Sequence, residues 1–414
     1  MQLGWIDFSK EDRDKVHEVM SLLQEPGAVD ELGIGPIRDA FANYFFPGTS
    51  TVQTKAKYFL LVPYLIQEAM NGKFGSDVNR VLSKIEDEEY ECAKIMFNFA
   101  KEEGKPVEGI IGNTNLPGKF VLRKPSNIYW SGIKTYGIVC SDQDLSIQNV
   151  VASGLYSRKN AATLNVGNRS DKAEEGEQDD SSAGKEKSTV LIKLPHSHQD
   201  DWRKNLHIEL TKDEAQFLRD MIQKNARKNN QDSLLVYMLK NHLPQKEYPD
   251  FDALYEDIKD DLKDGVHDEL ERMMKLACDF NKLVLVARTR YNLQLSDENS
   301  ERAKELWNEL SAKGMANVAY VDVDDVMGSL NLTQPNLRDF LKELQQHLLV
   351  EDYVEADICI KKWEKKKKKE RAKLSKSNRP KADVWVGGEK LDYRYFDALT
   401  ILQDIYRGEE SVNV

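Results

Sequence analysis

The sequence has no long apolar run and few cysteines. Its longest apolar stretch, FLLVPYLI at 59–66, is far shorter than the roughly 20 residues that a helix needs to cross a bilayer. The four cysteines lie far apart and form no CxxC pair, as is typical of reduced thiols in a cytoplasmic protein. The first stretch, MQLGWIDFSKEDRDK, lacks a basic segment followed by an apolar one, so we expect no secretory signal and a cytoplasmic location.

Familiar catalytic signatures are also missing. A Walker phosphate loop needs two glycines five residues apart, and FPGTSTVQTK at 46–55 contains only Gly48. GNTNLPGKF at 112–120 has the wrong glycine spacing and carries Phe120 where Ser or Thr must bind magnesium. His196 and His198 are followed by no third ligand at a metal-site spacing. The sequence therefore predicts no cofactor and no metal, and it favours a protein that is not an enzyme.

What is present is helical periodicity. Apolar residues recur at helical spacing over 35–46, from residue 49 or 50 to about 70, and over 76–103, 268–295 and 334–349. Thr211 with Glu214 three residues later has the pattern of a capping box. From 107 to 140 the residues are β-branched and aromatic with Gly and Pro between them, which predicts short strands. The predicted fold class is mainly α (α+β), with two helix-rich domains of which the first holds a few short strands.

One segment separates the two predicted domains. Residues 167–188, GNRSDKAEEGEQDDSSAGKEKS, contain no apolar side chain larger than Ala and cannot bury enough surface to offset the entropy of ordering. We therefore predict an N-terminal domain over 1–165, a flexible acidic linker over 166–189 and a C-terminal domain over 190–414.

Charge is distributed unevenly along the chain. Residues 361–381 hold twelve Lys/Arg and two Glu, a net +10, so that the rest of the chain carries −21 of the overall −11. Such a segment can attract a phosphate backbone while the remainder repels it. The predicted nucleic-acid-binding residues are Lys361, Lys362, Lys365, Lys366, Lys367, Lys368, Lys369, Arg371 and Lys373. The alternative is a solvated helical arm with Trp363 packed against the body, or a disordered run.

The stretch FPGTSTVQTKAKY at 46–58 has two interpretations. It is either an ordinary helix end followed by a Thr or Ser N-cap, or the turn of a helix-turn-helix unit. In the second interpretation the polar residues at the start of the following helix contact a phosphate, and the two lysines add positive charge. The residues of this candidate phosphate or partner site are Arg38, Thr49, Ser50, Gln53, Lys55 and Lys57.

Several stretches together resemble a bacterial family that bears a domain-of-unknown-function label. They are GWIDFSKEDR, RDAFANYFFPGTSTVQTKAKYFLLVPY, PSNIYWSGIKTYGI, LTKDEAQFL and LDYRYFDALTILQDI. The chain departs from the family pattern at Lys55 and Lys57, where Arg is usual, and at Tyr64, where Trp is usual. Because lysine lacks the planar fork of arginine, the two lysines weaken bidentate phosphate binding.

The resemblance also implies a setting. Genes of this family tend to lie beside helicase and phospholipase-D-like genes in phage-defence neighbourhoods, which implies a non-catalytic part of a defence system. The partners to expect are DNA, or the helicase or phospholipase-D-like proteins of the same system, and no membrane. Two alternatives stay open, an unrecognised enzyme (a nuclease or nucleotide-dependent effector) and a pure protein-interaction scaffold.

Overall fold

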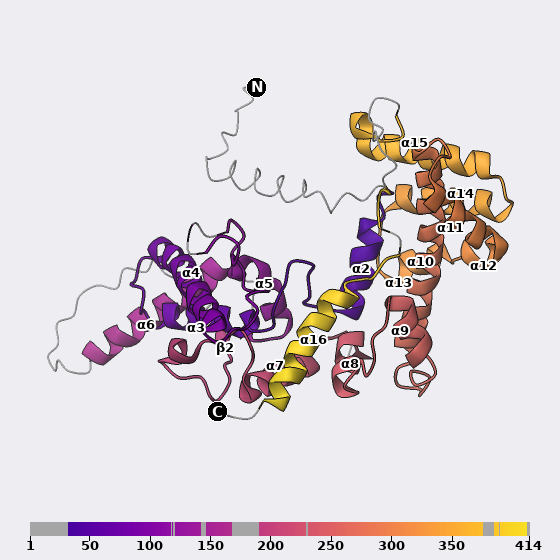
Figure 1. Ribbon diagram of the computed structural model, residues 1–414. Helices are drawn as coiled ribbons and strands as arrows, with labels where there is room; N and C mark the ends of the chain where they lie inside the picture. The colour runs from indigo at the N-terminus through magenta and orange to yellow at the C-terminus, as the bar shows by residue number, and fades with distance from the viewer. Residues whose placement is uncertain are drawn as a thin grey trace, which may run out of the picture. The chain divides into compact units, whose positions relative to one another are not determined.

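The computed structural model is mainly helical, with a few short strands (Figure 1). It describes residues 32–116, 118, 121–141, 146–167, 190–228, 231–375, 385–388 and 390–411. The predicted fold class is confirmed. In the described part of the chain no helix has the length and apolar character needed to span a bilayer.

The chain forms two compact units, each assembled from segments that are distant in sequence. Unit 1 comprises Met1–Phe41 and Asp250–Asp392, and unit 2 comprises Ala42–Pro249 and Tyr393–Val414. One boundary falls within helix α2 (Gly35–Phe45). The predicted domains 1–165 and 190–414 and their linker stay a prediction, since most of the linker lies outside the described residues.

Unit 2 is a group of helices with two minimal sheets. Its helices are α3 (Tyr58–Met70), α4 (Val78–Glu102), α5 (Pro125–Thr135), α6 (Ile147–Gly167), η1 (Trp202–Asn205), α7 (Lys212–Asn225), α8 (Leu234–Lys240) and α16 (Tyr395–Glu410). Strand β1 (Val139–Cys140) pairs antiparallel with β2 (Leu191–Ile192), and β3 (Arg227–Lys228) pairs antiparallel with β4 (Gln231–Asp232).

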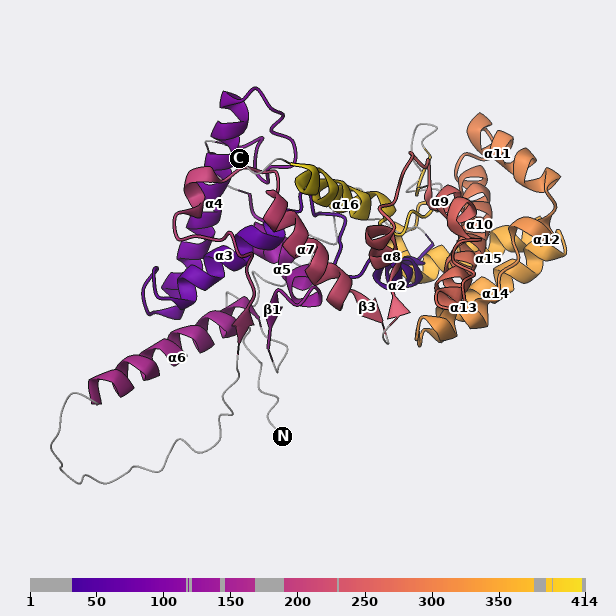
Figure 2. The ribbon, with the colours of Figure 1, turned by 90° about the horizontal axis from the view of Figure 1, so that it is seen from below.

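The core of unit 2 forms around α3. Nearly every residue of α3 is buried, because the helix is contacted by α4, α5 and α6. The last helix, α16, packs along α7 (Figure 2). The predicted capping box is confirmed at the start of α7, where the Thr211 side chain accepts from the Glu214 amide and the Glu214 side chain accepts from the Thr211 amide.

The strands predicted over 107–140 are largely wrong. Only β1 is a strand among the described residues of this segment, and PSNIYWSGIKT forms helix α5, with Pro125 in its first turn. Tyr129, Gly132 and Ile133 share the buried face of α5, which packs against α3. Burial of this face against α3 outweighs the β preference of its aromatic and β-branched residues.

Unit 1 is built on the long helix α10 (Asp268–Leu295), most of whose residues are buried. Around it lie α9 (Phe251–Ile258), α11 (Glu301–Ala312), α12 (Met315–Val318), α13 (Val323–Ser329), α14 (Pro335–Leu349), α15 (Tyr353–Lys368) and η2 (Lys369–Arg371). Helices α14 and α15 are joined by a short turn and lie side by side (Figure 1). The helices predicted over 268–295 and 334–349 are confirmed.

A buried carboxyl group joins α4 to α5 in unit 2. Glu89 is only 1 % exposed, and its two oxygens accept hydrogen bonds from the backbone N and the hydroxyl of Ser126, at 2.6 and 3.2 Å. Burial raises the pKa of Glu89 to about 8, although the Ser126 donors and the nearby Lys124 oppose this shift. Glu89 is therefore mainly protonated at neutral pH in the folded protein.

Glu89 should make the protein less stable as the pH rises from about 4.5 to about 8. In this range the folded state holds a proton that the unfolded chain has released, so deprotonation favours the unfolded state. The Glu89→Gln variant, whose amide cannot lose a proton, should lack this part of the pH dependence. The measurement is the free energy of unfolding by urea at several pH values from about 4.5 to about 8.5.

The matched control is Glu86→Gln, which changes an exposed carboxylate on the same helix. It should keep the pH dependence of the unchanged protein. Identical pH profiles for the Glu89→Gln variant and the unchanged protein would contradict the assignment of the buried proton to Glu89.

Candidate nucleic-acid interface

In the described chain, residues 361–371 of the Lys-rich segment (361–381) form the C-terminal half of α15 together with η2. The side chains of Lys361, Lys362, Lys365, Lys369 and Arg371 are exposed. Within the described part of the chain, none of these five side chains forms an ion pair. Lys361 and Lys365 are four residues apart in α15, so they share a face of the helix, whereas Lys369 and Arg371 belong to η2. We call these five residues the cation row.

The remaining predicted lysines have neighbours within unit 1. Lys366 donates from Nζ to the Asn336 side chain at 2.7 Å, and Lys367 places its Nζ 4.8 Å from the centre of the Trp363 ring. Lys368 and Lys373 are partly buried and also have partners. Of the predicted binding residues, the five in the cation row are thus the best placed to meet a phosphate.

Trp363 fixes one side of α15 to the rest of unit 1. Its ring is 4 % exposed and stacks on Phe340 of α14, with ring centres 4.6 Å apart. The indole Nε1 donates a hydrogen bond to the carbonyl oxygen of Leu32 at 2.5 Å. Residues 361–371 are helical, so the interpretation of this part as a disordered run is wrong, whereas the packing of Trp363 expected for a solvated helical arm is observed. Residues 376–384 lie outside the described chain.

Glu364 fixes the end of the same helix. Its carboxylate is fully buried and accepts hydrogen bonds from the Tyr291 hydroxyl at 2.7 Å and from the backbone N of Lys373 and Leu374 at 2.8 and 3.0 Å. These bonds hold the chain after η2 against the helix. Burial, with the adjacent Glu364 carboxylate, raises the pKa of Tyr291, so this hydroxyl stays a donor.

A third contact lies earlier in α15. Asp357 accepts two hydrogen bonds from the guanidinium of Arg290, the neighbour of Tyr291 on α10. Arg290 also lies over the ring of Trp307, 4.7 Å from its centre. Consecutive residues of α10 thus hold α15 at two points.

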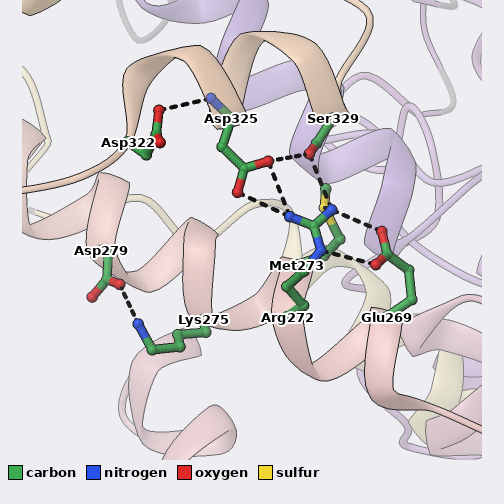
Figure 3. Close-up of polar contacts among 8 residues, drawn as sticks. All are labelled: Glu269, Arg272, Met273, Lys275, Asp279, Asp322, Asp325 and Ser329. Atoms are coloured by element: carbon green, nitrogen blue, oxygen red, sulfur yellow. Dashed lines mark hydrogen bonds and ion pairs between the residues drawn. The ribbon is translucent and has the colours of Figure 1, made fainter.

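Elsewhere in unit 1, the basic side chain of Arg272 pairs with carboxylates of the same unit. Figure 3 shows Arg272 of α10 between two carboxylates: it donates to Glu269 and, across to α13, to Asp325, at 2.9–3.1 Å. Its guanidinium also donates to the Ser329 hydroxyl, which itself donates to Asp325. The charge of this arginine is therefore used within the protein.

The acidic stretch VDVDDVMG at 321–328 likewise pairs with basic side chains, in this case those of α14. Asp324 pairs with Lys342 and Arg338, which lower the pKa of its carboxyl group. Arg338 and Lys342 both lie on α14. Their charges are therefore neutralised within unit 1.

The turn after α2 differs from the helix-turn-helix prediction. Helix α3 begins at Tyr58, so Thr49, Ser50 and Gln53 do not lie at its N-terminus, and the prediction of a helix start at residue 49 or 50 is wrong. The Thr49 hydroxyl donates to the Phe46 carbonyl at 2.7 Å. Gln53 closes the turn: it donates to the Gly48 carbonyl and accepts from the Ser50 amide.

Side chains from distant parts of unit 2 satisfy the amides that follow this turn. The amides of Thr54 and Lys55 donate to the Tyr129 hydroxyl at 2.7 and 3.0 Å. The amide of Ala56 donates to Asp404 of α16 at 2.9 Å. These donors are therefore already used within the protein, which is the physical reason why the helix begins late.

Gly48 allows the turn to lie against α5. Its φ is +83°, and a Cβ added there would stand 2.6 Å from the Tyr136 ring. Any other residue would meet both a strained backbone and a side-chain clash.

The two lysines after the turn face carboxylates. Lys55 donates to Asp404 at 3.1 Å. Lys57 is 3 % exposed and donates to both oxygens of Glu214, at 2.8 and 2.7 Å, and Tyr64 donates to the same carboxylate. The structure thus gives both lysines a role in joining α3 to α7 and α16.

Arg38, the last residue of the predicted phosphate site, belongs to unit 1, whereas residues 49–57 belong to unit 2. Its guanidinium pairs with the adjacent Asp39 at 3.0 Å. Phosphate or partner binding by Arg38, Thr49, Ser50, Gln53, Lys55 and Lys57 stays a prediction. Both lysines of this set are engaged by carboxylates in the structure.

No group of three or more His, Cys, Asp or Glu in the described residues could hold a metal ion. His198 instead stacks on the Tyr64 ring, with ring centres 4.1 Å apart, and Ser197 donates to Asp213. The sequence His196-Ser197-His198 thus packs onto α3 and the start of α7.

Glu364 is the residue of the interface that sequence reasoning missed. A glutamate within a lysine run looks like an ordinary solvated charge. Helical spacing holds a signal, because Ala356, Ile360 and Trp363 mark a buried stripe to which Glu364 is adjacent. The hydroxyl and the two amides that it binds come from positions 291, 373 and 374, and no local pattern indicates them.

Replacing Glu364 with Ala should destabilise unit 1 by about 2–4 kcal/mol, because it leaves three buried donors without an acceptor. Urea unfolding followed by tryptophan fluorescence measures this loss. Glu343→Ala, which removes an exposed carboxylate from α14, is the control and should change stability by less than about 0.5 kcal/mol. Equal stability of the two variants would contradict the anchoring role of Glu364.

Replacing Lys57 with Met should cost about 3–5 kcal/mol of stability, because it leaves the Glu214 carboxylate buried without its counter-ion. Lys55→Met should cost less, because the Lys55 side chain is 24 % exposed and Asp404 keeps the hydrogen bond from the Ala56 amide. Thermal unfolding of both variants tests this order. A Lys57→Met variant with unchanged stability and reduced phosphate binding would instead favour the phosphate site.

The comparisons with known proteins indicate an uncharacterised domain in the first part of the chain. Residues 1–161 match a family of unknown function (DUF6361). No curated protein and no solved structure matches the chain. The matched residues include the turn after α2 and helices α3–α5, whereas the Lys-rich segment lies outside them.

Proposed function

We propose that this protein is a non-catalytic, nucleic-acid-associated component of a bacterial anti-phage defence system. The observation that supports the proposal is the cation row on α15 and η2, held on an anchored helix. The defence setting rests on the motif resemblance. On the same basis, the partner proteins of the proposal are the helicase or phospholipase-D-like proteins of the system.

The cation row suits a phosphate backbone better than base edges. Lysine ammonium groups are compact point charges that attract phosphate oxygens without the planar fork that reads guanine. The buried Trp363 is not available for stacking with a base, since α14 already covers its ring. The proposed binding is therefore electrostatic, salt-dependent and nearly independent of sequence.

The scaffold alternative also has an observation in its favour. Val354 and Ile358 of α15 are exposed, at 70 % and 37 %, and neither apolar side chain has a use in phosphate binding. A protein contact through the first half of α15 is compatible with phosphate contact through its last turns.

Removing the cation row should weaken nucleic-acid binding for all sequences alike. Five neutralised phosphates would give a slope of about −4.5 for the logarithm of the binding constant against the logarithm of salt concentration. Changing Lys361, Lys362, Lys365 and Lys369 to Gln should make that slope shallower by about 0.9 for each phosphate that is no longer neutralised. Fluorescence anisotropy with two duplexes of unrelated sequence, over about 50–300 mM salt, is the measurement.

A control variant removes four charges that are already paired. It changes Lys275, Lys282, Arg338 and Lys342 to Gln, and these residues pair with Asp279 and Asp324. Its net charge equals that of the first variant, so a difference between the two reports the position of the charges. Absence of binding by the unchanged protein at low salt, or equal slopes for both variants, would overturn the proposal.

A further inference from the structure

The exposed face of α15 changes character along its length. Glu355 lies in its first turn and Glu351 in the turn just before the helix, where its φ is +58°; neither carboxylate forms an ion pair within the described residues. Val354 is the neighbour of Glu355, Ile358 follows about one turn later, and then come Lys361, Lys362 and Lys365. The residues of this set that lie in α15 are spaced three or four apart, so that they form one stripe with an acidic residue near its start, apolar residues beside it and basic residues at its end.

The stripe on one copy of α15 is complementary to the same stripe on a second copy that runs in the opposite direction. If a second copy of the helix lies against it in reverse, the apolar centres meet and each acidic end faces a basic end. With a two-fold axis at Ile358, this residue contacts its symmetry mate. Glu355 then lies beside Lys362 of the second copy, and the turn before the helix, which holds Glu351, comes next to its Lys365.

We propose that α15 is the contact surface of an antiparallel homodimer. Charge complementarity selects a second copy as the occupant, because a nucleic acid would be repelled by Glu351 and Glu355 and would leave Val354 and Ile358 exposed. The inference does not depend on nucleic-acid binding. Of the cation row, Lys369 and Arg371 lie beyond the start of the second helix and stay accessible to a phosphate in the dimer, whereas Lys361, Lys362 and Lys365 face the second copy and are available to a phosphate only in the monomer.

The length of α15 also sets the expected strength of the dimer. Helix α15 has 16 residues and is about 24 Å long, so one helix pair buries less surface than a standard stable interface. The partly buried pair Arg290–Asp357 and the anchors Trp363 and Glu364 keep the helix in place before association, which reduces the entropic cost of binding. We expect a reversible dimer with a dissociation constant on the order of micromolar.

Charge reversal tests the proposal in its specific form. One variant changes Glu351 and Glu355 to Lys, and the other changes Lys362 and Lys365 to Glu. Each alone should dimerise at least about tenfold more weakly than the unchanged protein, because like charges then meet across the axis. An equimolar mixture should form a heterodimer, since every pair is restored with its charges exchanged.

Sedimentation equilibrium of the full chain, after nuclease treatment, measures the dissociation constants of the unchanged protein, each variant and the mixture. Ile358→Asp should abolish the dimer, whereas Val266→Asp, at an exposed valine outside the stripe, should leave it unchanged. Circular dichroism of each variant checks that the helices are intact. A monomeric unchanged protein at several hundred micromolar, or a mixture that does not associate, would overturn the proposal.

Discussion

A helix that carries a run of lysines is ordered only if its opposite side is held strongly enough to offset their mutual repulsion. This constraint shapes the whole of α15. The side turned to the body contains Trp363, stacked on Phe340, and Glu364, a buried acceptor of three hydrogen bonds. Because both groups act at the C-terminal end, they order the turns where the lysines are densest.

The turn after α2 is also held by distant side chains, which here bind polar backbone groups. The backbone amides of residues 54–56, just before α3, would otherwise be unpaired. They donate hydrogen bonds to the Tyr129 hydroxyl and the Asp404 carboxylate. The side chain of Lys57 meets Glu214, which also caps α7. One short loop thereby fixes the mutual positions of α3, α5, α7 and α16 within unit 2.

In unit 1, ion pairing decides which charges can act outside the molecule. Arg272, Arg338 and Lys342 are engaged by carboxylates of α10 and α13. The cation row of α15 has no such partner in the described chain, and the exposed face of this helix has acidic residues at one end and basic residues at the other. An overall charge of −11 would not reveal this arrangement. Both proposals depend on it, one through phosphates and one through a second copy.

Local patterns were sufficient for several elements and insufficient for others. Helices α2, α4, α10 and α14 were predictable because apolar periodicity and helix-ending residues lie within each segment. Helix α5 was mistaken for strands, since its β-branched and aromatic residues are helical only through packing on α3. The start of α3 was misplaced by about two turns, because the acceptor for the Ala56 amide is 348 residues away.

The sequence by itself determined the helical class, the capping of α7 and the concentration of positive charge in one segment, because these follow from residue types and their spacing. Tertiary structure alone decided that Lys55 and Lys57 turn to carboxylates, whereas Lys361, Lys362 and Lys365 meet none among the described residues. All of these lysines have the same side-chain chemistry. They differ because folding brings a distant carboxylate within reach of some of them and not of the others.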